Sequence, residues 1–196
     1  NNHNAFLSMM EGALTGKTGF TGEAGYCYVG AVRQGDRTLI VALLACGWPN
    51  NKNYKWADMK TLVQYGLDQY GYCNYWEDAL QDQDIRILEA GKKRTVKDAP
   101  AKDGNLYQDG TVNTFLNIDD QDREKRILMK KTEAIQVQIE EKQEITAPIE
   151  SGDILGTVTI LLNGETLDEK PIVSGESIQK KNLLWIYRQL WKSYAL

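Results

Sequence analysis

The chain has 196 residues, 42% of them hydrophobic, and a formal net charge of −4 at pH 7. This length and composition suit one large globular domain or two small ones, each with a buried core. The acidic balance argues against a general nucleic-acid-binding protein, and the longest apolar stretch falls well short of the roughly 20 residues that a membrane-spanning helix requires.

The chain opens with Asn rather than Met, and its first residues lack the charged and then apolar pattern of a secretion signal. We therefore expect it to be a piece of a longer polypeptide.

Two β-rich runs, residues 26–32 and 37–46, open the first predicted domain. Gly35 and Asp36 lie between them and suit a tight hairpin turn. The second run is apolar on both faces, which predicts a central strand. The glycine-rich segment 16–22 precedes the first run, and we expect it to form or to lead into the edge of the same sheet.

A helix is predicted after these strands. Apolar side chains recur at helical spacing from Trp56 to Tyr70, with Asn53 as a possible cap upstream and Gly71 as a stop signal downstream. The aromatic stretch 70–76 follows, either as packing between two domains or as a platform for sugars. We place the end of the first domain, 1–76, after this stretch.

The pattern then changes to short alternating runs that are broken by Gly, Asp, Asn and Pro. Such a pattern is typical of a small antiparallel sandwich or barrel, and it predicts a second, β-rich domain over residues 77–176. Asn163 and Gly164 form a strong hairpin signal. The predicted strands cover residues 84–88, 111–118, 134–140, 153–162 and 166–173.

The tail, residues 177–196, is predicted to form an amphipathic helix. Its cations Lys181, Arg188 and Lys192 gather opposite the apolar arc, and Trp185 alone falls among them. Two interpretations stay open: binding to an anionic membrane interface, or docking onto its own domain. The apolar arc spans about 160° and holds Leu183, Leu184, Ile186, Tyr187, Leu190, Trp191 and Tyr194.

The chain holds three cysteines, without C-x-x-C spacing, and one histidine. We therefore expect no zinc site. Cys27 and Cys46 would form a disulfide only if their geometry and an oxidising compartment allow it.

The glycine-rich segment contains Gly16-Lys17-Thr18-Gly19, with Thr21 and Ala24-Gly25-Tyr26 shortly after it and Asn2-His3-Asn4 before it. K-T-G belongs to a known set of motifs, with S-x-x-K and an S-D-N-type triplet, in β-lactamases and penicillin-binding proteins. Together these pieces resemble the C-terminal portion of the penicillin-binding D-alanyl-D-alanine carboxypeptidases, which are serine peptidases of the cell wall. The resemblance covers nearly the whole chain.

The resemblance implies an α+β fold: the C-terminal strands and helix of a β-lactamase-like or transpeptidase-like domain, then a small sandwich-like all-β domain and an amphipathic helix. It also implies a substrate site at Lys17, Thr18, Gly19 and Thr21. A lysine and a hydroxyl suit the terminal carboxylate of a peptide ending in D-Ala-D-Ala. Gly19 would let the substrate backbone approach as an added strand, and we expect a distorted strand edge there.

The sequence departs from this family in one large respect. We interpret the chain as lacking S-x-x-K and S-x-N altogether, and therefore as lacking the nucleophilic serine and the base lysine that precede K-T-G in the family. The fragment alone is expected to be inactive. The resemblance implies no metal and no organic cofactor. The parent would remove the terminal D-Ala from peptidoglycan stem peptides through an acyl-enzyme that β-lactams trap. It would act outside the cytoplasm, at the outer face of the bacterial cytoplasmic membrane. The alternative is a non-catalytic cell-wall binding or scaffold module.

Overall fold

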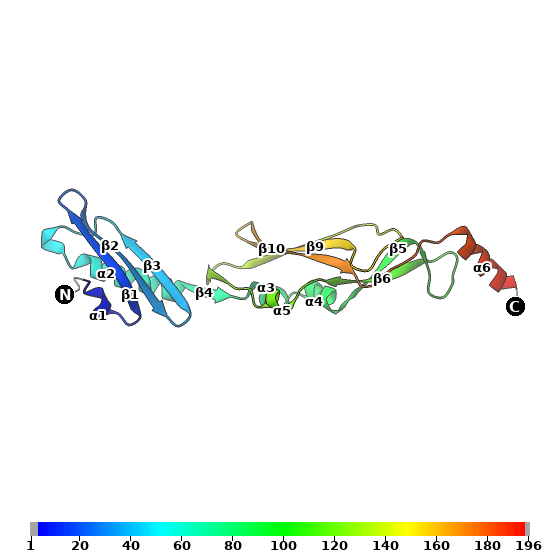
Figure 1. Cartoon of the computed structure of the whole chain (residues 1–196), viewed down its shortest axis with the longest axis horizontal. Coiled ribbons are helices and arrows are strands. Elements are labelled where there is room, and N and C mark those ends of the chain that lie inside the picture. Colours follow the sequence, from blue (N-terminus) through cyan, green and yellow to red (C-terminus); the bar gives the residue numbers. More distant parts are fainter. Residues whose placement is uncertain (1–3, 195–196) are drawn as a thin grey trace. The chain divides into compact units, whose positions relative to one another are not determined.

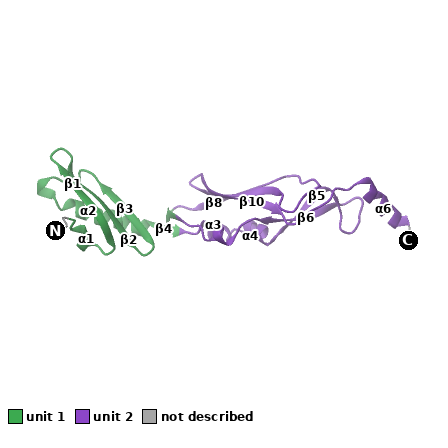
Figure 2. Ribbon diagram, in the orientation of Figure 1, with its two compact units in different colours: residues 1–72, 128–132 green, residues 73–127, 133–196 purple. Residues whose placement is uncertain are grey.

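The computed structural model describes residues 4–194 and divides the chain into two compact units. Unit 1 comprises residues 1–72 and 128–132, and unit 2 comprises residues 73–127 and 133–196 (Figure 2). A small two-stranded sheet pairs β4 (Tyr70–Cys73) with β7 (Ile127–Lys130). Among the described residues, no helix is long and apolar enough to cross a membrane.

Unit 1 is a three-stranded antiparallel sheet with helices on one face (Figure 1). The strands β1 (Ala13–Thr21), β2 (Gly25–Gln34) and β3 (Arg37–Leu43) lie in the order β1-β2-β3. The predicted hairpin between β2 and β3 is confirmed, since Gly35 turns the chain at a φ of +60°. The helical elements are α1 (Phe6–Met9), a 3₁₀ turn at Pro49–Asn51 and α2 (Tyr54–Gln69).

The core of unit 1 lies between the sheet and the two α-helices. Tyr28 and Val32 of β2 meet Phe6 of α1 and Met59 and Val63 of α2, and all five are at most 1% exposed. The side chains on α2 recur at i and i+4, which is the spacing that predicted this helix.

The two ends of α2 are held differently. Asn53 occupies the predicted N-cap position, but its side chain makes no capping hydrogen bond. At the other end, the guanidinium Nη1 of Arg37 donates to the carbonyl oxygens of Leu67 (2.7 Å) and Tyr70 (2.6 Å). Because the last carbonyl groups of a helix lack partners within the helix, this contact ties β3 to the end of α2.

The prediction of a central strand over residues 37–46 is wrong for the part of the chain that the structure describes. β2 is the central strand and β3 forms an edge of the sheet. The apolar side chains on both faces of β3 misled the prediction: Leu39 and Val41 pack against the helices, whereas Ile40, on the opposite face, is 74% exposed.

Unit 2 contains one five-stranded antiparallel sheet in the order β5-β6-β10-β9-β8, with helices beside it. The predicted mixed fold, mostly β, is confirmed, but this sheet is a half-barrel rather than a sandwich of two sheets. The strands are β5 (Lys92–Pro100), β6 (Asp109–Leu116), β8 (Ile135–Glu141), β9 (Ile154–Leu162) and β10 (Glu165–Ser174). The helices are α3 (Tyr75–Ala79), α4 (Gln83–Ala90), α5 (Asp120–Arg123) and α6 (Leu183–Tyr194).

Side-chain and backbone bonds join the two edges of the half-barrel. Lys92 of β5 pairs with Glu141 at the end of β8, with 2.8 Å between Nζ and Oε2. Farther along β5, the N–H of Lys97 donates to the carbonyl oxygen of Ile145 (2.8 Å), and the N–H of Ala147 donates back to Lys97 (2.9 Å). These bonds satisfy part of an edge strand that would otherwise present unpaired backbone groups.

Residues 84–88 form part of helix α4, so the strand predicted there is wrong. The carboxylate of Asp82 accepts hydrogen bonds from the N–H groups of Asp84 and Ile85, which is an N-cap, and Gly91 follows the helix at a φ of +98°. Ile85 and Leu88 are buried three residues apart on one helix face. The cap therefore decides between helix and strand where a short apolar run fits both.

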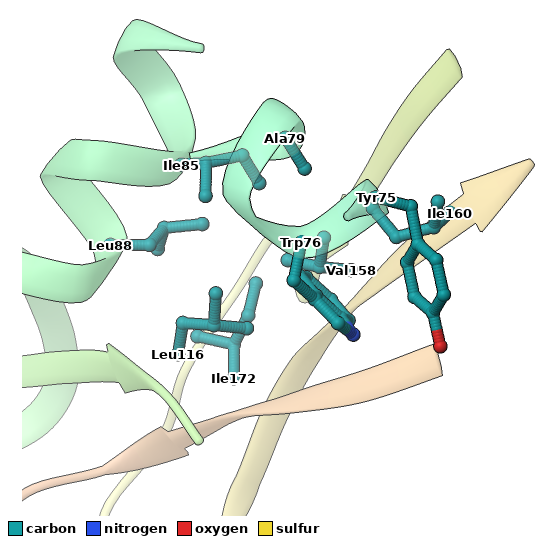
Figure 3. Packing of buried hydrophobic residues seen from close by; sticks show 9 residues of the cluster. All are labelled: Tyr75, Trp76, Ala79, Ile85, Leu88, Leu116, Val158, Ile160 and Ile172. Atoms are coloured by element: carbon teal, nitrogen blue, oxygen red, sulfur yellow. The ribbon is translucent and has the colours of Figure 1, made fainter. Parts of the chain in front are cut away.

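The core of unit 2 surrounds Trp76 of α3, which is completely buried. In Figure 3 its indole points from α3 toward Val158 of β9 and Ile172 of β10. Trp76 is therefore a core residue, and the sugar-platform interpretation of the aromatic stretch fails at this position. The buried members of the cluster are Tyr75, Trp76, Ala79, Ile85, Leu88, Leu116, Val158, Ile160 and Ile172.

A network of charges lies at the edge of this core. Asp168 accepts hydrogen bonds at Oδ2 from the indole Nε1 of Trp76 (3.0 Å) and from Nζ of Lys125 (2.9 Å). Lys125 and Lys170 also reach Oδ1 of Asp122, at 2.8 Å and 2.5 Å. The hydrogen bond from Lys125, followed by that from Lys170, holds the pKa of Asp122 well below its usual range.

This network predicts a loss of stability in acid. Burial alone raises the pKa of Asp168, but the hydrogen bonds from Trp76 and Lys125 outweigh it, so that the net pKa is lowered. Because the folded-state pKa values of Asp122 and Asp168 lie below the unfolded value of about 3.9, their stabilisation is complete above that pH. It is lost as the pH falls through the folded-state values. We expect thermal unfolding, followed by circular dichroism, to show a falling melting temperature of unit 2 below about pH 4.

The variant Asp122→Asn isolates this contribution from that of the other carboxylates. It should be less stable than the wild type at pH 6 and should lose less stability between pH 6 and pH 3. Equal losses in the two proteins would contradict the assignment.

Candidate functional site

The Lys-Thr-Gly motif lies on β1, at one edge of the sheet of unit 1. Lys17 is paired with Val29, Thr18 with Tyr28 and Gly19 with Cys27, in regular antiparallel register from Thr15 to Thr21. The irregularity in this pairing falls earlier, between Ala13 and Thr15. The expectation of a distorted edge at Lys-Thr-Gly is therefore wrong, because the motif lies in a regularly paired part of β1.

The side chains of Lys17 and Thr18 leave the strand on opposite faces. Lys17 is exposed beside Val29, whereas Thr18 is half-buried beside the buried Tyr28. The ammonium group of Lys17 donates to the carbonyl oxygen of Thr18 at 2.7 Å. A cation and a hydroxyl thus flank the same open edge, one from each face.

Gly19 and Thr21 complete the four predicted site residues. A Cβ at Gly19 would meet only the Cβ of Cys27, at 4.0 Å, so contacts among the described residues do not require glycine there. This leaves room for another backbone to approach the edge. The hydroxyl of Thr21 accepts a hydrogen bond from the N–H of Ala24 at 3.0 Å, and so helps to close the turn between β1 and β2.

Tyr28 supports this strand from the covered face, which the sequence reasoning missed. Gly16 and Gly30 lie opposite each other in the register, and the ring of Tyr28 fills the space that both leave. The Tyr28 hydroxyl donates to Oδ1 of Asn4 at 3.0 Å. Burial raises the pKa of Tyr28, so the hydroxyl stays protonated and able to donate. The signal in the sequence is two glycines around a bulky aromatic residue, but it is readable only once the register is known.

Gly16→Val is expected to destabilise unit 1 by about 1–3 kcal/mol, because its Cβ would lie 2.2 Å from the Tyr28 hydroxyl oxygen. The matched control is Gly19→Val on the same strand, where the added side chain meets open space and valine favours a strand. Hydrogen exchange of the β1 and β2 amides measures the stability of unit 1 in both variants. Equal protection in the two variants would show that Tyr28 does not limit the space at Gly16.

The cysteines and the Asn2-His3-Asn4 triplet are the other residues singled out in the sequence. Cys27, Cys46 and Cys73 are all free thiols, so the possible Cys27–Cys46 disulfide is not formed. Burial, together with the neighbouring Asp78, raises the pKa of Cys73 to about 12. Asn2 and His3 of the predicted triplet lie outside the described residues. Within residues 4–194 no group of three His, Cys, Asp or Glu side chains could hold a metal ion.

Ser177 and Lys180 have the S-x-x-K spacing, so the interpretation that this pattern is absent from the chain is wrong. The hydroxyl of Ser177 accepts a hydrogen bond from the N–H of Ser151 at 3.0 Å. Lys180 pairs with Asp98 at 3.5 Å. Both residues lie in the extended segment before α6, with other partners, and so they do not form a nucleophile and its base.

Comparisons with known proteins bear on the second half of the chain. Residues 121–180 match the family model described as "Penicillin-binding protein 5, C-terminal domain". This part of the chain is therefore similar to that domain. The match covers most of α5, then β7, β8, β9 and β10, so it includes three of the five strands of the half-barrel and the β9–β10 hairpin.

Two relatives extend the similarity toward Lys-Thr-Gly. D-alanyl-D-alanine carboxypeptidase DacF of Bacillus subtilis is 25% identical over 187 residues, which are 93% of this chain and 41% of DacF. The crystal structure of D-alanyl-D-alanine carboxypeptidase DacD from Francisella tularensis has a similar fold, with a TM-score of 0.50 and 22% identity. It covers 92% of this chain and 40% of DacD. The predicted resemblance to penicillin-binding carboxypeptidases is confirmed, and the chain spans about two fifths of the length of these relatives.

Proposed function

We propose that this chain is part of a serine-type D-Ala-D-Ala carboxypeptidase that acts on peptidoglycan stem peptides at the outer face of the bacterial cytoplasmic membrane. The observation that carries the proposal is the open edge of β1, where Lys17 and Thr18 flank a strand with room beside Gly19. The similarity to DacF supports it, since that relative is named a carboxypeptidase and matches 93% of this chain.

In this proposal β1 is one wall of the active site. The substrate backbone adds to the edge of β1 as a further strand, and main-chain hydrogen bonds hold it there. The ammonium group of Lys17, on the exposed face of the strand, binds the terminal carboxylate, whose negative charge strengthens the hydrogen bond. The hydroxyl of Thr18 lies on the opposite face of the same edge. Tyr28 keeps the strand in place, and Thr21 fixes the turn that follows.

The covalent step belongs to residues outside this chain. A serine hydroxyl attacks the carbonyl carbon of the penultimate D-Ala, a base takes its proton, and the terminal D-Ala leaves as the amine. Water then hydrolyses the acyl-enzyme. A β-lactam acylates the same serine by opening of its ring, and the opened drug remains attached as an ester.

Helix α6 is proposed to hold the protein at the membrane. Its residues Leu183, Tyr187 and Trp191 are 86%, 59% and 63% exposed. Leu, Tyr and Trp on one helix face, with Arg188 and Lys192 on another, suit the headgroup level of an anionic bilayer. The ring of Tyr187 lies 6.4 Å from that of Trp191, so the two aromatic side chains form a continuous apolar surface.

Intact mass spectrometry of the native protein, incubated with a fluorescent penicillin, tests the proposal. We expect a labelled species much heavier than 22.2 kDa that contains the peptides of this chain. An unlabelled species of 22.2 kDa alone would contradict the enzyme proposal and favour a non-catalytic cell-wall binding or scaffold module.

A further inference from the structure

Lys181, in the segment before α6, binds this segment to the β5–β6 region of unit 2. Its N–H donates to the carbonyl oxygen of Asp98 at 2.7 Å, and its ammonium group donates to the carbonyl oxygen of Gln108 at 2.7 Å. The ammonium group also lies 3.6 Å from the carboxylate of Asp109. The Lys181 side chain is only 16% exposed, so it lies inside the unit rather than on the helix surface.

The loop between β5 and β6, residues 101–108, also contacts α6. A Cβ at Gly104 would lie 2.9 Å from Oε1 of Gln189, so the loop touches the middle of the helix. The loop and the helix line a cavity of about 420 Å³, whose lining includes Lys102, Lys192 and Ser193. We call residues 98–109 the cradle of α6.

The cradle explains which helix face is left open. Trp185, Ile186 and Gln189 are half-buried, and Trp185 and Gln189 lie opposite the exposed apolar arc. The two interpretations of the tail are therefore compatible: one face docks on unit 2, and the other, with Leu183 and Trp191, is free. The position of Trp185 among the cations follows from this docking.

A helix of this length needs such support. α6 has 12 residues, and an isolated helix of that length is marginal in water. Asn182 caps its start by accepting a hydrogen bond from the N–H of Trp185 at 2.8 Å, but one cap alone does not make so short a helix stable. The contacts of Lys181 fix the residue next to this cap.

We propose that the cradle holds α6 folded in solution with its apolar face outward, and that Lys181 is the positioning residue that makes it a preformed surface for an anionic lipid bilayer. The lipid partner rests on the proposed function; the ordering of the helix does not. A preformed helix binds more tightly than a disordered tail, because it does not lose conformational entropy on binding.

The test compares Lys181→Met with Lys180→Met. Both remove one positive charge from neighbouring positions, but the Lys180 side chain is 56% exposed and pairs with the equally exposed Asp98 at 3.5 Å. Hydrogen exchange in solution should show protected amides over residues 186–194 in the wild type and in Lys180→Met, and lost protection in Lys181→Met. Equal protection in the two variants would overturn the proposal.

Vesicles of phosphatidylcholine and phosphatidylglycerol provide the second readout. Lys181→Met should bind about tenfold more weakly than Lys180→Met and should gain helical circular dichroism on binding, since its tail must then fold at the surface. Equal affinities would overturn the role of Lys181 in lipid binding. A wild type that binds no vesicles would refute the membrane proposal, while the exchange experiment would still decide whether the cradle orders α6.

Gly104→Val separates positioning from general stability. It places atoms against Gln189 without touching the core of unit 2, so the sheet should keep its exchange protection while α6 loses it. Loss of protection throughout β9 and β10 would mean that the loop supports the whole unit, and not α6 in particular.

Discussion

Trp76→Ala is expected to destabilise unit 2 by about 3–5 kcal/mol. The side chain is 0% exposed and lies in the largest cluster of buried residues, so its removal leaves a cavity that the half-barrel cannot close. The substitution also removes the indole N–H that donates to Asp168 at 3.0 Å. Asp168 is 15% exposed at its side chain, and the loss of a donor to a largely buried carboxylate adds to the cost.

Hydrogen exchange followed by mass spectrometry measures this effect for each unit separately, since two compact units need not unfold together. Peptides from β9 and β10 should lose protection, whereas those from β1 and β2 should not. The matched control is Trp191→Ala, at 63% exposure, which should change stability by no more than about 0.5 kcal/mol. A similar small effect at Trp76 would show that α3 is not part of the core.

The parts of the fold that the sequence predicts well depend on local chemistry. The hairpin at Asn163 and Gly164 needs two residues with positive φ, and the structure has them at +54° and +82°. The helix α2 follows from an apolar stripe that is long enough to exclude a strand. In both cases a few neighbouring residues decide the conformation, so no knowledge of the rest of the chain is required.

The errors arise where distant contacts decide. Residues 84–88 alternate well enough for a strand, and only the cap at Asp82 and the core beneath Leu88 select the helix. The position of β3 at an edge depends on how many strands the sheet contains, which periodicity does not reveal. The support of β1 by Tyr28 depends on register, since Gly16 and Gly30 become neighbours only when β1 and β2 pair.

The motif of the candidate site was readable because its residues are adjacent in sequence, on one strand. The chemistry of the motif predicts Lys17 and Thr18 as a carboxylate site, and the structure adds the open edge beside them. The cradle of α6 was not predictable, because Lys181 looks like one more cation of the tail. Its partners, Gln108 and Asp109, come from a loop more than seventy residues earlier in the chain.

Lys17→Met is expected to slow acylation by penicillin by about 10²–10³-fold in the longer protein to which we propose the chain belongs. Lys17 is exposed at the open edge of β1, and its ammonium group donates to a neighbouring carbonyl oxygen, that of Thr18. It is therefore available to a carboxylate, which is a stronger acceptor. The fluorescent penicillin measures the rate of labelling directly.

The substrate itself distinguishes carboxylate binding from a general loss of structure. With a peptide that ends in a free D-Ala-D-Ala carboxylate, Lys17→Met should lower kcat/KM strongly; with the same peptide amidated at its end, the wild type and the variant should be nearly equal. Lys52→Met, at an exposed position beyond the sheet, controls for loss of charge and should match the wild type with both peptides. If Lys17→Met reduced turnover of both peptides alike, Lys17 would act on the strand or the nucleophile rather than on the carboxylate. Binding of the terminal carboxylate at the β1 edge would then be assigned to Thr18 and the backbone.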